Sequence, residues 1–198
     1  MSVLEIAAVA FGLVSVYLST RQNIWSWPTA IVNVALYAVL FWREKLYADM
    51  GLQVIFLILS VYGWYEWLFG GENKTALHVS RLTRHTATIL IVIAMAGSMA
   101  LGFILQRATD ASLPWLDATL AVVSLVAQWM MTRKILENWL LWIAVDIVYV
   151  GMFFFLKNLY LTGFQYTVFL ALAVAGHRQW LRSYCARVND GAADATHA

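Results

Sequence analysis

The chain has 198 residues, of which 62% are hydrophobic and only 12% are charged, whereas soluble domains carry about 25% charged residues. This composition excludes a soluble globular protein, and the scattered basic residues, with a net charge of only +2, exclude a nucleic-acid-binding patch. One cysteine cannot form an internal disulfide, and the lack of paired-carboxylate, HExxH, phosphate-loop and nucleophile-elbow motifs argues against an enzyme, a cofactor or a bound metal ion.

Long apolar stretches dominate the chain, and about 20 apolar residues are enough to cross a bilayer core as a helix. The expected spans, in chain order, are 4–20, 25–42, 51–69, 87–105, 115–132, 138–156 and 161–180. The predicted fold class is therefore an all-α membrane protein with seven transmembrane helices. We divide it into a first three-helix unit (1–69), a cytoplasmic loop with a linker helix (70–110), a second three-helix unit (111–182) and a polar cytoplasmic tail (183–198), of which residues 186–198 are expected to lack regular structure.

The two ends of the chain repeat one another. Residues 4–67 can be laid over residues 116–180 with an offset of 112 or 113, which matches residue types that rarely coincide in a hydrophobic chain. The matched pairs include Arg21/Arg133, Trp27/Trp139, Tyr37/Tyr149, Lys45/Lys157, Gln53/Gln165, Gly63/Gly176 and Trp67/Trp180. Because the span 87–105 lies between the units, each matched pair falls on one side of the membrane, which predicts a parallel 3+1+3 repeat. Two such units usually enclose a substrate path, so we predict a small transporter.

Lysine and arginine are unevenly divided between the two sides of the predicted bundle. The side of the N-terminus holds four of them, and the opposite side holds nine, at positions 21, 74, 81, 84, 133, 134, 178, 182 and 187. Because basic residues collect on the cytoplasmic side of membrane proteins, the count predicts an external N-terminus and a cytoplasmic C-terminus.

The sixth span carries the strongest indication of a binding site. Trp139, Trp142, Asp146 and Tyr149 follow the spacing i, i+3, i+7, i+10 and therefore share one helix face. A carboxylate inside the membrane marks a ligand or ion path by default, and indole faces attract cations by roughly 0.5–2 kcal/mol. This face favours a flat, cationic, aromatic ligand. Two alternatives remain open: Asp146 could bond a neighbouring helix and only stabilise the bundle, and Trp139 could belong to the interfacial aromatic belt.

Polar side chains in other spans complete the candidate site. Asn33 and Tyr37 share a face of the second span, and Asn33 lies one position before the counterpart of Asp146. Gln53 and Gln165 occupy the same position in the two units. These amides could bind the amide or ribose of a ligand, or they could form hydrogen bonds between helices.

Several stretches resemble the Pnu family of bacterial vitamin transporters. They are Met131-Thr-Arg-Lys134, Glu137-Asn138-Trp139-Leu-Leu-Trp142, Leu46-Tyr47-Ala with Gln53-Val54, Tyr62-Gly-Trp-Tyr-Glu-Trp67 and Leu159-Tyr160. The resemblance extends over nearly the whole chain and adds Asn138 to the candidate site. It implies an arrangement akin to the SWEET sugar transporters, a homotrimer in the bacterial inner membrane and facilitated diffusion without a coupling ion. It also implies that phosphorylation by a cytoplasmic kinase traps the vitamin.

The resemblance and the polar face together rank the substrates. Nicotinamide riboside carries a pyridinium and thiamine a thiazolium, and both flat cations suit Trp142 and Asp146, whereas riboflavin is larger and neutral. We therefore expect uptake of nicotinamide riboside for NAD biosynthesis, with thiamine and then riboflavin as alternatives. A channel is disfavoured because no ring-type selectivity filter is indicated. A non-transporting scaffold subunit is the alternative of another class, but it would have little use for Asp146 beside two tryptophans.

Overall fold

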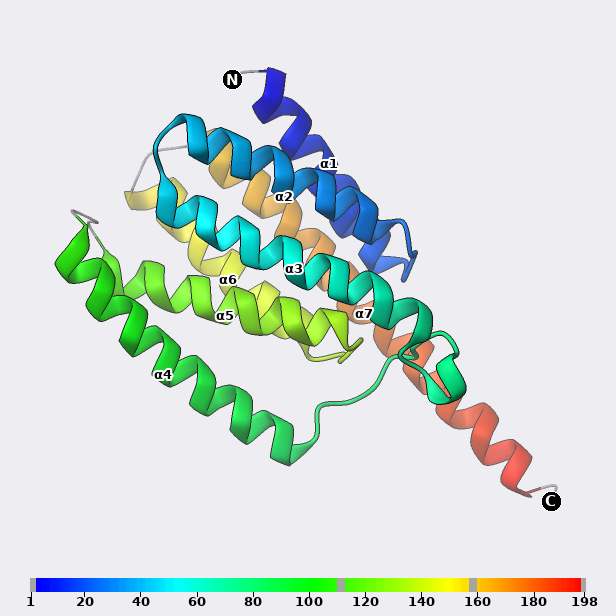
Figure 1. Ribbon diagram of the computed structural model, residues 1–198. Coiled ribbons are helices and arrows are strands. Elements are labelled where there is room, and N and C mark those ends of the chain that lie inside the picture. The colour runs from blue at the N-terminus through cyan, green and yellow to red at the C-terminus, as the bar shows by residue number, and fades with distance from the viewer. Residues whose placement is uncertain (1–2, 110–112, 157–159, 197–198) are drawn as a thin grey trace.

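The computed structural model describes residues 3–109, 113–156 and 160–196, which form a bundle of seven α-helices (Figure 1). The helices are α1 (Val3–Thr20), α2 (Ser26–Arg43), α3 (Tyr47–Phe69), α4 (Arg84–Ala108), α5 (Pro114–Thr132), α6 (Asn138–Gly151) and α7 (Tyr160–Thr196). A short 3₁₀ turn, Glu72–Lys74, lies in the loop before α4, and a π-helical turn, Met152–Leu156, continues α6.

All seven expected helices are present near their expected positions, and five of them are long and apolar enough to cross a membrane. These five are α1, the Asp49–Phe69 part of α3, α4, α5, and α6 with its π-helical turn. In α2, polar residues such as Thr29, Asn33 and Tyr37 interrupt the apolar sequence. That α2 and α7 also cross the membrane stays a prediction.

The expectation of a tail without regular structure was wrong, because α7 continues as a helix to Thr196 (Figure 1). The tail is rich in alanine, which has the highest intrinsic helix propensity. Extending a helix that has already formed also avoids the cost of nucleation. The tail therefore projects beyond the bundle as a continuation of α7.

The helices form two groups of neighbours. In the first group α2 packs between α1 and α3, and in the second group α6 packs against both α5 and α7. The groups meet along two seams, α1 against α7 and α3 against α5. The helix α4 packs against α5 at the edge of the bundle (Figure 1).

The turns that join α1 to α2 and α5 to α6 have the same construction. Gln22 and Lys134, which are 112 positions apart, are both left-handed, with φ of 53° and 48°. The next amide donates back to a helix carbonyl in each turn, Asn23 to Leu18 and Ile135 to Met130, at 3.0 Å in both cases. These turns bring α2 and α6 back into the bundle at matched positions.

A glycine in α3 and another in α7 each make room for a tryptophan. A Cβ at Gly63 would lie 2.3 Å from Cη2 of Trp27, and a Cβ at Gly176 would lie 2.6 Å from Cζ2 of Trp139. Both separations are far below van der Waals contact. The two glycines therefore permit the close packing of both indole rings, one in each helix group.

Four tryptophans close the bundle at the end where α1, α3 and α5 finish. The ring centroids of Trp27 and Trp67 are 5.2 Å apart, those of Trp139 and Trp180 are 5.5 Å apart, and Trp67 and Trp180 link the two pairs at 5.8 Å. Such edge-to-face contacts stabilise a core beyond their buried area. We call this cluster, formed by Trp27, Trp67, Trp139 and Trp180, the tryptophan seal.

The two central tryptophans of the seal also bind the opposite helix group. The indole N–H of Trp67 donates to the carbonyl of Met131 at 3.0 Å, and the indole N–H of Trp180 donates to the carbonyl of Ser19, also at 3.0 Å. Each helix group thus supplies the donor for one bond and the acceptor for the other. The tryptophan seal joins the two groups by a crossed pair of hydrogen bonds.

Candidate substrate cavity

A cavity of about 400 Å³ lies at the centre of the bundle, between the two helix groups. This volume is within the usual range of small-molecule sites, roughly 300–1,000 Å³. Six helices line it, and among the described residues none of α4 does. At one end the cavity reaches two members of the tryptophan seal, Trp27 and Trp139.

The wall of the cavity mixes aromatic rings with uncharged polar side chains and one carboxylate. The polar lining consists of Ser15, Ser19, Asn33, Tyr37, Gln53, Ser60, Gln128, Asp146, Thr162, Gln165 and Tyr166. The large aromatic and apolar side chains of the lining include those of Phe41, Phe56, Met131, Trp142 and Phe169. Such a wall can surround a flat ring and also offer several hydrogen bonds to a polar substituent.

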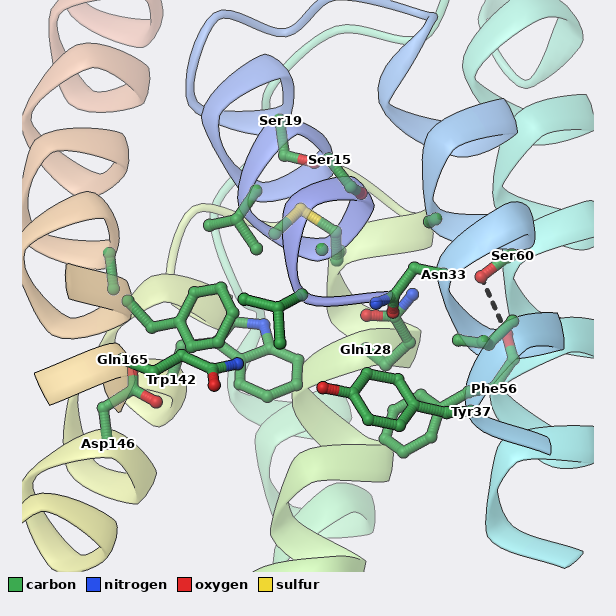
Figure 2. A pocket seen from close by; sticks show the side chains of 18 of the residues that line it. Ser15, Ser19, Asn33, Tyr37, Phe56, Ser60, Gln128, Trp142, Asp146 and Gln165 are labelled. Carbon is green, nitrogen blue, oxygen red and sulfur yellow. Dashed lines mark hydrogen bonds between the residues drawn. The ribbon is translucent and has the colours of Figure 1, made fainter. Parts of the chain in front are cut away.

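Among the described lining residues, Asp146 is the one carboxylate, and it is 5% exposed. It lies beside Trp142 and Gln165 on the α6–α7 side of the cavity (Figure 2). Among the described residues, no cation forms an ion pair with it and no donor forms a hydrogen bond with it. A bond from Asp146 to a neighbouring helix, which was the structural alternative, is therefore absent from the described part of the bundle. A buried carboxylate without a partner is costly, and a cationic ligand would supply the missing partner.

Trp139 and Trp142 both line the cavity, as the helical spacing predicts. Trp139 is buried within the tryptophan seal, so it is not a free interfacial residue. Its indole N–H and that of Trp27 are buried and have no hydrogen-bond partner among the described residues. Trp142 lies one turn nearer to Asp146, where an aromatic ring can stack between the indole and the opposite wall.

The opposite wall is built by α2 and α3 (Figure 2). The Asn33 amide donates to the carbonyl of Ala8 in α1 at 2.7 Å, and Gly12 leaves the space for this contact. Asn33 therefore lines the cavity and also bridges two helices. Tyr37 points across the cavity toward Gln165 (Figure 2), and Gln53 lines the same wall.

Two of the nine candidate residues from the sequence lie outside the cavity lining. Tyr149 stacks on Tyr166, with ring centroids 4.6 Å apart, and Tyr166 rather than Tyr149 faces the cavity. Asn138 is fully buried at the start of α6, where its amide donates to the carbonyl of Ile135 at 2.6 Å. Tyr149 therefore packs behind a residue of the cavity wall, and Asn138 stabilises the turn between α5 and α6.

Several lining residues were not predicted from the sequence, among them Gln128 and Tyr166. Gln128 lies next to Asn33 in the cavity (Figure 2). It is an uncharged amide within a long apolar span, so its polarity alone could have identified it. Nothing in the sequence distinguishes the cavity face of Tyr166 from that of the neighbouring aromatic residues.

Two basic residues next to the tryptophan seal, Arg133 and Lys134, form contacts outside the cavity. Arg133 forms an ion pair with Glu66 at 2.7 Å. Lys134 donates to the carbonyl of Leu77 at 2.9 Å and lies 4.4 Å from the ring centroid of Trp67. Burial lowers the pKa of Lys134 to about 8. Within the described residues, no cluster of three His, Cys, Asp or Glu side chains is placed to hold a metal ion.

A bundle of apolar helices around a polar cavity, closed at one end by packed aromatics, defines a membrane transporter for a small polar solute. Residues 2–182 match the family model described as nicotinamide mononucleotide transporter. The chain belongs to this family, so the resemblance to the Pnu vitamin transporters is confirmed.

Individual relatives agree with this assignment. The chain is 27% identical to the nicotinamide riboside transporter PnuC of Escherichia coli (strain K12), over 92% of this chain and 87% of that protein. It is 30% identical to the riboflavin/roseoflavin transporter RibM of Streptomyces davaonensis, over 87% of this chain and 82% of that protein. A crystal structure of the vitamin B3 transporter PnuC superposes with a TM-score of 0.69 at 26% identity, covering 90% of this chain and 80% of that one.

Proposed function

We propose that this protein takes up nicotinamide riboside through the bacterial inner membrane by facilitated diffusion, and that phosphorylation inside the cell traps the substrate. The observation that carries the choice of substrate is the unpaired carboxylate of Asp146 beside Trp142 in the cavity. Nicotinamide riboside presents a flat pyridinium ring, which can stack on the indole while its positive charge faces the carboxylate. The name of the Escherichia coli relative supports the same substrate.

The amides of the cavity suit the rest of this substrate. A carboxamide and a ribose offer donors and acceptors to Asn33, Gln53, Gln128 and Gln165, which surround the space in front of Trp142. A site built to hydrogen-bond a hydroxyl or amide rejects analogues that lack it, because its own buried polar groups would remain unpaired.

Thiamine and riboflavin are the alternatives within the family. Thiamine carries a cationic thiazolium, so Asp146 would favour it as well. Riboflavin is neutral and would leave the carboxylate without a partner. It is an alternative because the chain is similar to the riboflavin/roseoflavin transporter RibM.

We also propose that the seven helices form two parallel three-helix units, α1–α3 and α5–α7, related as in the SWEET transporters and joined by α4. Three matched features support this division. They are the α1–α2 and α5–α6 turns, the glycines Gly63 and Gly176 that each make room for a tryptophan, and the crossed hydrogen bonds of Trp67 and Trp180. The positive-inside rule places the tryptophan seal on the cytoplasmic side, with the C-terminus. Rocking of one unit against the other would open the cavity to each side in turn. The resemblance to the family further suggests a homotrimer with one pathway in each subunit.

Ligand titration of the purified protein in detergent tests the substrate directly. Tryptophan fluorescence is followed while nicotinamide riboside, thiamine and riboflavin are added separately. We expect saturable quenching by nicotinamide riboside, and a loss in Trp142→Ala of about 1–3 kcal/mol of binding free energy, the value of one aromatic stacking contact. Saturation by thiamine alone would change the substrate, and a response to none of the three vitamins would refute vitamin binding.

Uptake into sealed vesicles tests the mode of transport. Facilitated diffusion predicts that labelled nicotinamide riboside equilibrates without an ion gradient, and that an enclosed kinase with ATP makes it accumulate. Accumulation that requires a proton or sodium gradient would contradict the proposal. No uptake by a protein that binds the vitamin would favour a non-transporting scaffold.

A further inference from the structure

The two seams between the helix groups are closed by equivalent hydrogen bonds. They differ in their ion pairs, in their contacts with the α3–α4 loop and in the polarity of the adjacent cavity lining. The α3–α5 seam has the bond from Trp67 to the Met131 carbonyl, and the α1–α7 seam has the bond from Trp180 to the Ser19 carbonyl. The acceptors are 112 positions apart and the donors 113 apart. The two seams can therefore be compared residue by residue.

An ion pair reinforces the α3–α5 seam alone. Arg133 binds Glu66 at 2.7 Å and also donates to the Tyr62 hydroxyl at 3.2 Å. The counterparts at the α1–α7 seam are Arg21 and the uncharged Gln179, and within the described residues no ion pair involves Arg21. Its guanidinium lies 5.7 Å from the ring of Tyr17 on the same helix. The α1–α7 seam thus lacks the electrostatic contact of the other seam.

The loop between α3 and α4 adds a second reinforcement on the same side. Its Leu77 amide donates to the Trp67 carbonyl at 3.2 Å, and its Leu77 carbonyl accepts from Lys134 at 2.9 Å. It also accepts a hydrogen bond from Arg187 of α7, at the Val79 carbonyl. Among the described residues, no hydrogen bond links this loop to α1 or α2. The hydrogen bonds of the loop therefore tie α3, the α5–α6 turn and α7 together, whereas the described contact of the loop with the α1–α2 hairpin is apolar packing, of Leu77 and Val79 in the cluster that contains Trp27.

The surfaces behind the two bonds also differ in polarity. Ser15 and Ser19 line the cavity on the α1 side. Their counterparts on α5 are Ala127 and Met131, which are 0% and 6% exposed. At the turn nearest the tryptophan seal, a polar solute meets the Ser19 hydroxyl on α1 and the Met131 side chain on α5, whereas Gln128, the polar lining residue of α5, lies about one turn farther from the seal. Movement along α1 therefore costs less desolvation free energy.

From these differences we infer that the substrate leaves the cavity on the tryptophan side through the α1–α7 seam only. Trp180 acts as the lid: release breaks its bond to Ser19, and the α1–α3 unit turns about the closed α3–α5 seam so that α1 moves away from α7. The α3–α5 seam stays closed throughout the cycle, held by Trp67, by Glu66 with Arg133, and by the loop. This inference rests on the transport and the orientation proposed above, since it assigns the exit of that pathway.

Cysteine accessibility distinguishes the two seams. In a Cys185→Ser background, which removes the one native cysteine, Ser19→Cys reports on the α1–α7 seam and Met131→Cys reports on the α3–α5 seam. Both substitutions keep the main-chain carbonyl that accepts the indole bond. A membrane-impermeant maleimide is applied to the cytoplasmic face of inside-out vesicles without substrate, so that ligand protection cannot interfere.

The test compares matched removal of the two indole donors. Trp180→Phe should raise the labelling rate of Ser19→Cys about fivefold, the population change expected from one net hydrogen bond. Trp67→Phe should leave the rate at Met131→Cys unchanged, because the ion pair and the loop still hold that seam. Equal acceleration at both cysteines would overturn the inference, and so would an unchanged rate at Ser19→Cys.

Two additions keep the test decisive. If a Phe variant unfolds in detergent, the variants with both tryptophans intact are compared, and Ser19→Cys should label several-fold faster than Met131→Cys; equal rates would contradict the single exit. Adding Arg133→Gln to Trp67→Phe should then open the second seam and accelerate Met131→Cys. Since labelling needs no vitamin, failure of this inference is distinguishable from failure of the proposed substrate.

Discussion

At the scale of single residues, the proposed selectivity of the cavity depends on Asp146. Its carboxylate is buried and unpaired within the described structure, so replacing it removes charge without breaking a helix contact. We expect Asp146→Asn to weaken nicotinamide riboside binding by about 10- to 100-fold, the range of a hydrogen bond or contact to a charged group. Any binding of neutral riboflavin should not weaken. Parallel fluorescence titrations of the two vitamins measure this, and unchanged affinity for nicotinamide riboside would make Asp146 structural.

Gly176 has a steric role that can be separated from helix propensity. A Cβ there would enter the ring of Trp139, whereas a Cβ at Gly51 would meet nothing within 4 Å. Alanine normally stabilises a helix relative to glycine by about 0.5–1 kcal/mol, but overpacking costs about 1–3 kcal/mol. We expect Gly176→Ala to lower the free energy of unfolding by about 1–2 kcal/mol, and Gly51→Ala to preserve or raise it. Thermal unfolding of both variants in one detergent decides the matter; equal midpoints would contradict the close packing at Trp139.

Lys134 makes the stability of the tryptophan seal depend on pH. Burial lowers its pKa to about 8 from an ordinary value of 10.5. Between these values the unfolded chain binds the proton and the folded chain does not, so stability rises with pH over this range. Below pH 8 the full cost of the buried charge is present. The unfolding midpoint of the wild type, relative to Lys134→Met, should therefore increase from pH 8 to pH 10. The exposed Lys74→Met serves as the control, and a constant difference would refute the shift.

At the scale of elements, the C-terminal extension of α7 is separate from the cavity. The cavity residues of α7 lie between Thr162 and Ala173, and the last described side-chain contact beyond them is that of Arg187 with Val79. A chain that ends at Asn189 should therefore bind its ligand as the full chain does. A chain that ends at Tyr184 should lose the contact with the loop and unfold at a lower temperature. If the chain that ends at Asn189 already binds its ligand more weakly, α7 couples to the site in a way that these contacts do not explain.

The helices could be predicted from the sequence because span length and apolar composition are local properties. The face of α6 could also be predicted, since helical spacing alone brings Trp139, Trp142 and Asp146 to one side. Gln128 could have been predicted from its polarity within an apolar span, but Tyr166 could not, because its exposure to the cavity depends on how the two helix groups pack together. Tyr149 has the right spacing, but its ring lies behind Tyr166. That displacement arises from contact between helices, which no periodicity in one helix specifies.

At the scale of the whole molecule, the native cysteine can report the orientation in the membrane. Cys185 is the single cysteine of the chain, and it is exposed on the part of α7 beyond the tryptophan seal. The proposed orientation places it in the cytoplasm. A membrane-impermeant maleimide should therefore label it in inside-out vesicles and spare it in right-side-out vesicles, with detergent-opened vesicles as the positive control. The reverse pattern would invert the topology and turn the proposed exit into the entrance.

The crossed bonds of the tryptophan seal bear on the ancestry of the molecule. Neither half of the chain contains both the donor and the acceptor of a closing bond: Trp67 needs Met131, and Trp180 needs Ser19. A single ancestral half could have formed the same closure only as a pair of identical subunits, each indole reaching the carbonyl of the other copy. Under the proposed repeat architecture, fusion into one gene would have freed the two copies to diverge. One seam could acquire its salt bridge while the other kept its serines, an asymmetry that a dimer of identical chains cannot encode.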